Sequence, residues 1–294
     1  MASDKERDVN VDRFRIKPGK QVSLADYDPE ECAPFRDRSE ADGLLEQEME
    51  QLTAWQERLY AERRWSLLLV FQGMDGSGKD SIVKHVLRGL HPFATQAVAF
   101  KQPSSEDLDH DFLWRCVRFL PERGRIGIFN RSYYEEVLIV RVDPRVLAGQ
   151  RLPSRLVSKK IWSERFEDIN HFEQFQARNG TAIRKFYLNV SKDEQRRRFI
   201  ERIDDPAKNW KFSLEDVEKR KQWTKYRKAY EDMLSATSTA HAPWYVVPAD
   251  RKWFTRIVVA RVVRETLAAL DPKFPKLSSE QQAELAVARK ELEK

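Results

Sequence analysis

Short apolar runs alternate with longer amphipathic stretches along most of this chain. The clearest run, WSLLLVFQ at 65–72, has the length of a strand that is covered on both faces of its sheet. The preceding stretch, 44–64, has helical periodicity instead, because these apolar residues fall near one face of a helix: Leu45, Met49, Leu52, Leu59 and Tyr60. The pattern therefore predicts a helix followed by a buried strand.

Four further apolar runs have the residue types of strands, namely QAVAF at 96–100, RIGIF at 125–129, AIRKFYLNV at 182–190 and PWYVVPAD at 243–250. Helical patterns lie between them: after Asp80, in a stretch ending at Leu120, over 152–180, after a capping box formed by Ser191 and Glu194, and over 252–270. Strands that alternate with helices predict an α/β fold, in which a parallel sheet is covered on both faces and the ligand site lies at the carboxyl ends of the strands.

The chain of 294 residues, 41% of them hydrophobic, is long enough for one main domain with appendages. We interpret 1–43 as an N-terminal extension, 44–271 as the main domain and 272–294 as a charged tail. Because no run of about 18 apolar residues occurs, we expect neither export nor a membrane span. Cys32 and Cys116 match no metal or redox spacing, and so few thiols suit a reducing cytoplasm.

The chain is moderately basic, with a net charge of +6 and a pI near 9.2. Its cations cluster in QRRRFIER at 195–202 and EKRKQWTKYRK at 218–228. Solvated helix faces are the simpler interpretation of such clusters, and a cationic groove for a polyanion is the alternative.

The stretch FQGMDGSGKD at 71–80 follows the first strand and opens a helix, which is the order that a phosphate-binding loop requires. Glycines let consecutive backbone N–H groups turn toward one anion, and the lysine and the helix N-terminus add positive charge. An ordinary glycine turn is the alternative. The predicted phosphate-binding residues are Gly73, Met74, Gly76, Ser77, Gly78, Lys79 and Asp80.

Two carboxylates in this loop are unexpected for an anion site. Asp80 stands where a hydroxyl residue normally follows the lysine, and Asp75 lies inside the loop. A carboxylate beside phosphates is repelled unless a divalent cation or a proton lies between them. We therefore predict that Asp75 or Asp80 faces magnesium or the reacting phosphate. Capping of the new helix is an equally good interpretation of Asp80.

The third strand ends in Asn130 and Arg131, where many phosphate-loop enzymes place a magnesium-binding aspartate. Asn130 can ligate a metal without bringing charge, and Glu135 and Glu136 follow closely enough to restore it. Arg131 is placed for a bidentate phosphate contact.

The basic segment around Pro206 is the last candidate element. It can close over a transferring phosphoryl group as a lid at about 198–222, and a solvated helical hairpin is the alternative. The cations concerned are Arg198, Arg202, Lys208, Lys211 and Arg220.

Five separated motifs together resemble the type-2 polyphosphate kinases over 43–271: GMDGSGKD, FKQPSSEDLDHDFLWR, FNRSYYEEVLIVRV, DDPAKNWKFS and APWYVVPAD. The resemblance implies a three-layer phosphate-loop kinase core with a helical lid, which transfers phosphoryl groups between inorganic polyphosphate and nucleotides with Mg²⁺, or alternatively Mn²⁺. It implies that Asp75 engages the acceptor phosphate or its metal and that Arg131 and the lid cations neutralise the transferring charge. A basic groove for the polyphosphate chain is expected from Lys84, Arg123 and Lys211.

The pattern is most similar to the subgroup that accepts AMP and ADP and forms ADP and ATP, although Asn130 replaces the aspartate of other members. The resemblance also implies a homo-oligomer, a dimer or a tetramer. An ATP-dependent nucleoside monophosphate kinase of the same fold is the alternative, and a nucleic-acid-binding protein is a further one for which we find no motif.

Overall fold

The computed structural model describes residues 9–86 and 88–294. Its five strands form one sheet in the order β2-β3-β1-β4-β5, and all neighbouring strands are parallel. The strands are β1 (Ser66–Gln72), β2 (Thr95–Ala99), β3 (Ile126–Asn130), β4 (Thr181–Asn189) and β5 (Trp244–Pro248). The predicted parallel α/β fold is confirmed, with a strand in each of the five apolar runs.

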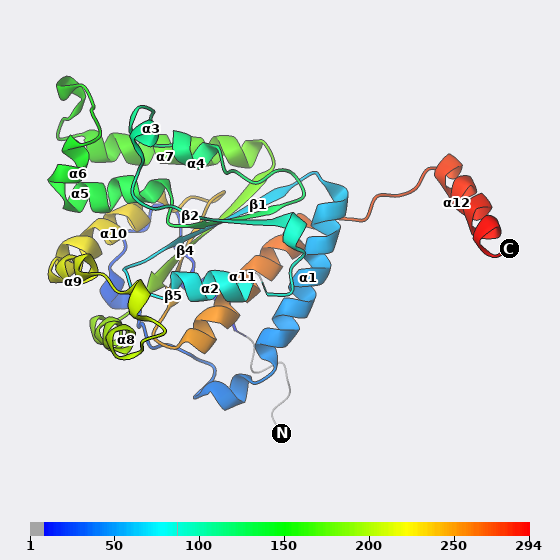
Figure 1. Ribbon diagram of the computed structural model, residues 1–294, viewed down its shortest axis with the longest axis horizontal. Helices are drawn as coiled ribbons and strands as arrows, with labels where there is room; N and C mark the ends of the chain where they lie inside the picture. The colour runs from blue at the N-terminus through cyan, green and yellow to red at the C-terminus, as the bar shows by residue number, and fades with distance from the viewer. Residues whose placement is uncertain (1–8, 87) are drawn as a thin grey trace.

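Helices cover both faces of the sheet and give three layers (Figure 1). One face carries α1 (Leu44–Glu62), α2 (Lys79–Val86) and α11 (Lys252–Leu270). The other carries α7 (Ile161–Arg178) and α10 (Trp223–Thr237), with the short helices α3 (Ser105–Leu108), α4 (Trp114–Val117), α5 (Ile139–Val142) and α6 (Pro144–Ala148). This double cover explains the continuous apolar run of β1, because every residue of that strand is buried.

Two helix predictions were too long. The pattern over 152–180 becomes a 3-10 turn at Ser154–Leu156 and a helix that starts only at Ile161. The side chains of Leu156 and Val157 remain exposed, so no packing surface supports a helix there. The stretch ending at Leu120 likewise contains only α4, which has four residues.

The two ends of the chain behave differently. Residues 9–43 add buried side chains to the main core, and the Ile16 N–H donates to the Trp244 carbonyl at 2.9 Å along the free edge of β5. The other end forms α12 (Ser279–Leu292), which extends away from the body with every residue exposed (Figure 1). Within the described residues, no helix has both the length and the apolar character that crossing a bilayer requires.

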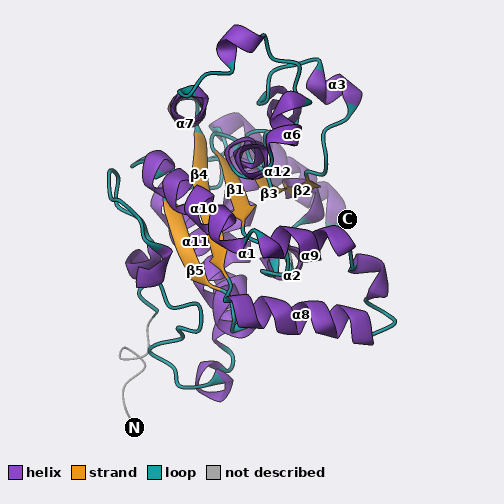
Figure 2. Cartoon of the chain, turned by 90° about the vertical axis from the view of Figure 1, so that its left-hand side faces the viewer, coloured by secondary structure: helices purple, strands orange, loops and turns teal. Residues whose placement is uncertain are grey.

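Two further helices, α8 (Lys192–Asp204) and α9 (Leu214–Lys221), lie beyond the carboxyl ends of the strands (Figure 2). Ser191 caps α8 by accepting a hydrogen bond from the Glu194 N–H at 3.1 Å, and Ser213 caps α9 in the same way. The segment between the two helices carries Trp210, which is 78% exposed. We call α8 and α9 the lid helices.

A charged network lies in the core between the sheet and α7. Lys185 of β4 and Glu173 of α7 are fully buried and form an ion pair at 2.6 Å. Glu173 also accepts hydrogen bonds from the hydroxyls of Tyr133 and Tyr134, which follow β3. Burial lowers the pKa of Lys185 to about 8 and raises the pKa of both tyrosines. The network fixes the turn that leaves β3.

This network gives a test of the fold. Glu173→Gln leaves the Lys185 ammonium buried without a counter-charge, so we expect the free energy of unfolding to fall by roughly 3–5 kcal/mol in urea titrations. The double replacement Glu173→Gln with Lys185→Met should lose less, because no unpaired charge remains. An unchanged urea midpoint for Glu173→Gln would contradict this account.

Candidate functional site

The loop at 73–78 joins β1 to α2 and can be built only with glycine at two positions. A Cβ atom on Gly73 would lie 2.7 Å from Ser77 Oγ, and one on Gly76 would lie 3.0 Å from the Phe199 ring. Gly76 also has a φ of +83°, which L side chains rarely adopt. The Ser77 hydroxyl is buried and has no hydrogen-bond partner. The glycine loop, as we call 73–78, therefore has a close-packed backbone and an unused polar atom.

Lys79 is the first residue of α2 and folds back over this loop. Its ammonium donates to the carbonyls of Gly73 at 2.6 Å and Met74 at 3.1 Å. Burial, reinforced by the charge of Arg131, lowers the pKa of Lys79 to about 8. A bound anion would restore the charged form, which is the behaviour of a phosphate-binding lysine.

Asp75 lies at the centre of a cluster of cations. It forms an ion pair with Arg131 at the end of β3, and Lys219 of α9 lies 3.9 Å from its second oxygen. Burial alone would raise the pKa of Asp75, but the charges of Arg131, Lys79 and Lys219 hold it below its usual value. Asp75 is therefore an ionised carboxylate that links the loop, the sheet and one lid helix.

Arg131 is held in an unusual backbone conformation at the carboxyl end of β3. Its φ is 65°, and its N–H donates to the Phe71 carbonyl at 3.0 Å. The guanidinium also donates to Glu135 at 3.3 Å, and Glu135 followed by Asp75 raises the pKa of Arg131. Left-handed conformations of residues other than glycine cost free energy and concentrate at functional sites.

Two residues of α8 hold the loop from the other side. Gln195 donates to the Asp75 carbonyl at 2.6 Å, and Arg198 donates to the carbonyls of Gly76 at 2.9 Å and Ala249 at 2.6 Å. The buried guanidinium of Arg198 also pairs with Glu194. Arg198 was predicted to be a catalytic lid cation; the structure instead makes it a positioning residue, because its donors are taken by fixed acceptors.

Asp80 and Asn130 face each other beside the loop. Asn130 donates its amide N–H to the Asp80 carboxylate at 2.7 Å. Of the residues that the structure describes, no three His, Cys, Asp or Glu side chains form a group able to hold a metal ion. Magnesium usually needs only one or two carboxylates together with substrate phosphates, and Asp75 within the loop and Asp80 on α2 could supply them.

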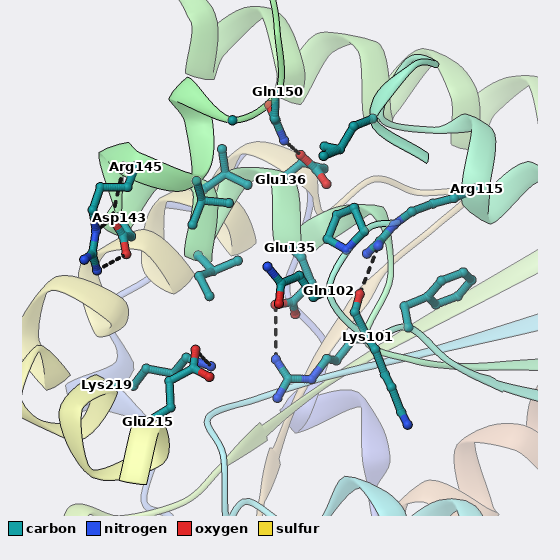
Figure 3. Close-up of a pocket in the computed structure, with 18 residues that line it drawn as sticks. Lys101, Gln102, Arg115, Glu135, Glu136, Asp143, Arg145, Gln150, Glu215 and Lys219 are labelled. Atoms are coloured by element: carbon teal, nitrogen blue, oxygen red, sulfur yellow. Dashed lines mark hydrogen bonds and ion pairs between the residues drawn. The ribbon is translucent and has the colours of Figure 1, made fainter. Parts of the chain in front are cut away.

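A cleft of about 630 Å³ opens next to the loop, between the sheet edge and α9. Arg131, Glu135 and Lys219 line both this cleft and a smaller pocket that reaches Gly73 and Asp75. Glu136 and Gln150 lie on the wall of the larger cleft, as Figure 3 shows. The cleft and the loop therefore meet at the two cations that contact Asp75.

Glu136 does not lie with the other predicted metal ligands. Its carboxylate accepts a hydrogen bond from Gln150 and is 3.5 Å from Arg165, and burial raises its pKa. The reason is local geometry: Glu135 and Glu136 are neighbours in a 3-10 turn, so their side chains leave in different directions. The metal-ligand prediction for Glu136 is therefore corrected to a cleft-wall residue.

The remaining predicted lid cations divide into two groups: Arg202 and Arg220 lie on the lid helices, and Lys208 and Lys211 lie in the segment between them. Arg202 lies 3.5 Å from Asp216 and close enough to Asp75 to lower its pKa, and Arg220 donates to Gln195 at 2.8 Å. Lys208 pairs with Asp205 at 2.8 Å, and Lys211 lies over the exposed Trp210 ring. Lys84 is exposed on α2.

Arg123 lies at the end of the sheet opposite the glycine loop, so the prediction of one polyphosphate groove shared with Lys211 is wrong. It donates to the carbonyls of Arg64 at 3.3 Å and Asn179 at 3.4 Å, just before β1 and β4 begin. Because the strands are parallel, these residues lie at the edge of the sheet opposite the glycine loop.

Sequence reasoning also missed contributors to the site. Lys219 was not singled out within its basic stretch, although it is one position from the chosen Arg220, and Gln195 had no signal beyond its place in the first turn of a capped helix. The cleft residues Lys101, Gln102 and Arg115 come from the loop and short helices after β2. They too were missed because no sequence signal distinguished them.

Residues 36–275 match the family described as polyphosphate kinase 2. The chain is 46% identical to an ADP-polyphosphate phosphotransferase of Rhodopseudomonas palustris over 97% of this chain and 99% of that protein. It is 39% identical to an AMP/ADP-polyphosphate phosphotransferase of Meiothermus ruber, over 90% and 95% of the two chains. A crystal structure of polyphosphate kinase 2 from Arthrobacter aurescens superposes with a TM-score of 0.83 at 38% identity, covering 94% of this chain and 95% of that one.

The low pKa of Lys79 predicts how anion binding depends on pH. Below about pH 8 the Lys79 ammonium of the free protein is charged. As the pH rises above 8, the free protein loses this positive charge, whereas a lysine with the ordinary pKa of 10.5 would keep it. We expect affinity for tripolyphosphate, measured by calorimetry, to fall by up to about tenfold per pH unit above 8. Lys79→Arg keeps its charge throughout and should flatten the decline. Equal declines in both proteins would assign the effect to another group.

Proposed function

The chain belongs to the polyphosphate kinase 2 family, and we propose that it transfers a phosphoryl group from inorganic polyphosphate to AMP or ADP, forming ADP or ATP reversibly. The names of its relatives support this donor and these acceptors. The observation that carries the proposal is the junction of the glycine loop with the cleft at Arg131 and Lys219. One phosphate group in the loop and another in the cleft would face each other there.

Transfer between two phosphate chains needs positioning and charge neutralisation more than a protein nucleophile. In this proposal the polyphosphate end lies on the glycine loop, and Lys79 contacts its oxygens. Arg131 and Lys219 neutralise the phosphoryl group in transit, and Asp75 holds both cations in place. The lid helices exclude water, so that transfer is favoured over hydrolysis.

The nucleotide is proposed to occupy the cleft with its phosphates toward Arg131. The cleft has apolar walls from Phe100, Leu108, Ile139 and Val146, which suit a base and ribose. Its volume of about 630 Å³ lies in the usual range for small-molecule sites. Lys101 and Arg115 add positive charge to the same wall.

We propose Mg²⁺, or alternatively Mn²⁺, as the cofactor. Asp75 and Asp80 would hold it, with Glu135 next to Arg131 as the nearest further carboxylate. The bound ion would screen these carboxylates from the phosphates and balance charge on the transferring group. Asn130 donates its amide N–H to Asp80, so in this proposal it orients that carboxylate and is not itself a metal ligand. Assembly as a dimer or tetramer and a cytoplasmic location stay predictions from the sequence.

Product analysis tests the donor directly. Incubation with polyphosphate, Mg²⁺ and AMP, with no ATP present, should yield ADP and then ATP. Chromatography of the nucleotides measures both products. If AMP is untouched, the same incubation with ADP decides whether only the diphosphate is accepted. No product from either acceptor, with turnover when ATP is the donor, would favour a nucleoside monophosphate kinase.

Asp75→Asn tests the role of the central carboxylate. Without its charge, Arg131 and Lys219 are no longer held at the junction, and we expect kcat at saturating magnesium to fall by roughly 100-fold. The matched control is Asp109→Asn, which removes an exposed carboxylate paired with Arg151 and should keep normal turnover. A rise in KM with unchanged kcat would contradict the role of Asp75 in charge handling.

A further inference from the structure

Four arginines gather at the end of the sheet that the site does not use. Arg63 and Arg64 precede β1, Arg123 lies shortly before β3, and Arg178 is the last residue of α7 before β4. All four are exposed. In Figure 1 this end lies on the right, where α1 ends, and the lid helices lie on the left. We call these four residues the distal arginine patch.

Backbone contacts place the members of the patch side by side. The Arg123 guanidinium donates to the carbonyls of Arg64 and Asn179, so it spans the segments before β1 and β4. Gly124 donates its N–H to the Trp65 carbonyl at 2.7 Å, and a Cβ atom on Gly124 would lie 3.2 Å from Arg63 Cγ. Arg178 directly precedes Asn179. The patch is thus one surface made from three strand entrances.

The patch differs from the rest of the surface in its charge balance. Outside the patch, eight of the twelve exposed arginines in the described residues form an ion pair with a carboxylate, as Arg36, Arg145 and Arg197 do. Across residues 9–86 and 88–294, none of the four patch arginines forms an ion pair. The acidic residues directly before Arg63 and Arg123 in the sequence have other partners: Glu62 accepts from the Lys273 N–H, and Glu122 pairs with Arg125 at 3.3 Å.

We propose that the distal arginine patch binds a second stretch of the polyphosphate chain whose reacting end lies in the glycine loop. This inference rests on the proposed function. Arginine presents a planar fork of donors that matches phosphate oxygens, and a surface of like charges without counter-ions favours a polyanion. The donor of the proposed reaction is itself a linear polyanion.

The distance between the two sites selects long chains. The seven residues of β1 separate the patch from the glycine loop, which is about 23 Å at ~3.3 Å per residue, and a path over the surface is longer. Only a long chain reaches both sites at once. Binding at two linked sites raises the apparent affinity without a new contact at the reacting end. The enzyme therefore prefers long chains through the patch.

The test compares polyphosphate fractions of defined short and long length as donors for AMP. The variant Arg63→Gln/Arg64→Gln/Arg178→Gln leaves Arg123 with its backbone hydrogen bonds, so the strand entrances stay intact. We expect its KM for long chains to rise by at least about tenfold, with kcat and the KM for short chains unchanged. Fluorescence anisotropy with labelled long-chain polyphosphate should show the same loss of affinity.

A matched control removes the same charge elsewhere. Arg289→Gln/Lys290→Gln/Lys294→Gln on and after α12 should leave both KM values unchanged. An equal rise for short and long chains, or a similar rise in the control, would assign the effect to overall charge and overturn the proposal. Unchanged KM values in the patch variant, or a changed oligomer mass, would also overturn it. So would single-stranded DNA that displaces labelled polyphosphate at a lower concentration, counted in phosphate groups, than unlabelled polyphosphate does. Wild-type protein that is inactive with every chain length would instead refute the proposed function.

Discussion

The ion pair between Asp75 and Arg131 is the contact on which the rest of the site depends. It joins the loop after β1 to the end of β3, and Lys219 extends it to α9. Neighbouring parallel strands end at the same edge of the sheet, so one carboxylate can connect all three elements. The left-handed backbone of Arg131 is tolerated because this contact and the Glu135 hydrogen bond fix its side chain.

The same pair explains why an anion site contains carboxylates. Lys79, Arg131 and Lys219 would repel one another in a buried site if no negative charge stood among them. Asp75 provides that charge in the free protein, although burial and then the charge of Arg131 still lower the pKa of Lys79. In the proposed reaction, a phosphate chain that enters the loop would add negative charge beside these cations. The site is thus electrostatically prepared for a substrate with more charge than the protein supplies.

The sequence predicted those parts of the fold and site that depend on local pattern. The buried strands, the glycine loop with Lys79, and the cap at Ser191 each have a signature within a few residues. The errors concern residues whose place depends on tertiary packing. Arg123 lies just before β3, at the end of the sheet opposite the glycine loop. Glu136 is next to Glu135 in the sequence, yet its carboxylate faces Arg165. Neither outcome follows from spacing, because the direction of a side chain in a loop or 3-10 turn depends on what surrounds it.

The polarity of the sheet also separates two kinds of positive charge. At the carboxyl ends, Lys79, Arg131 and Arg198 are hydrogen-bonded, and Lys79 and Arg198 are also buried, so the site has a fixed geometry that suits chemistry at a single phosphorus atom. At the amino ends, the distal arginines are exposed and without carboxylate partners, which suits the flexible polyanion that we propose for them. In our proposal the rigid cationic site sets which bond reacts, and the exposed cationic surface sets how much of the polymer is held. A parallel sheet provides both without bringing either set of charges near the other.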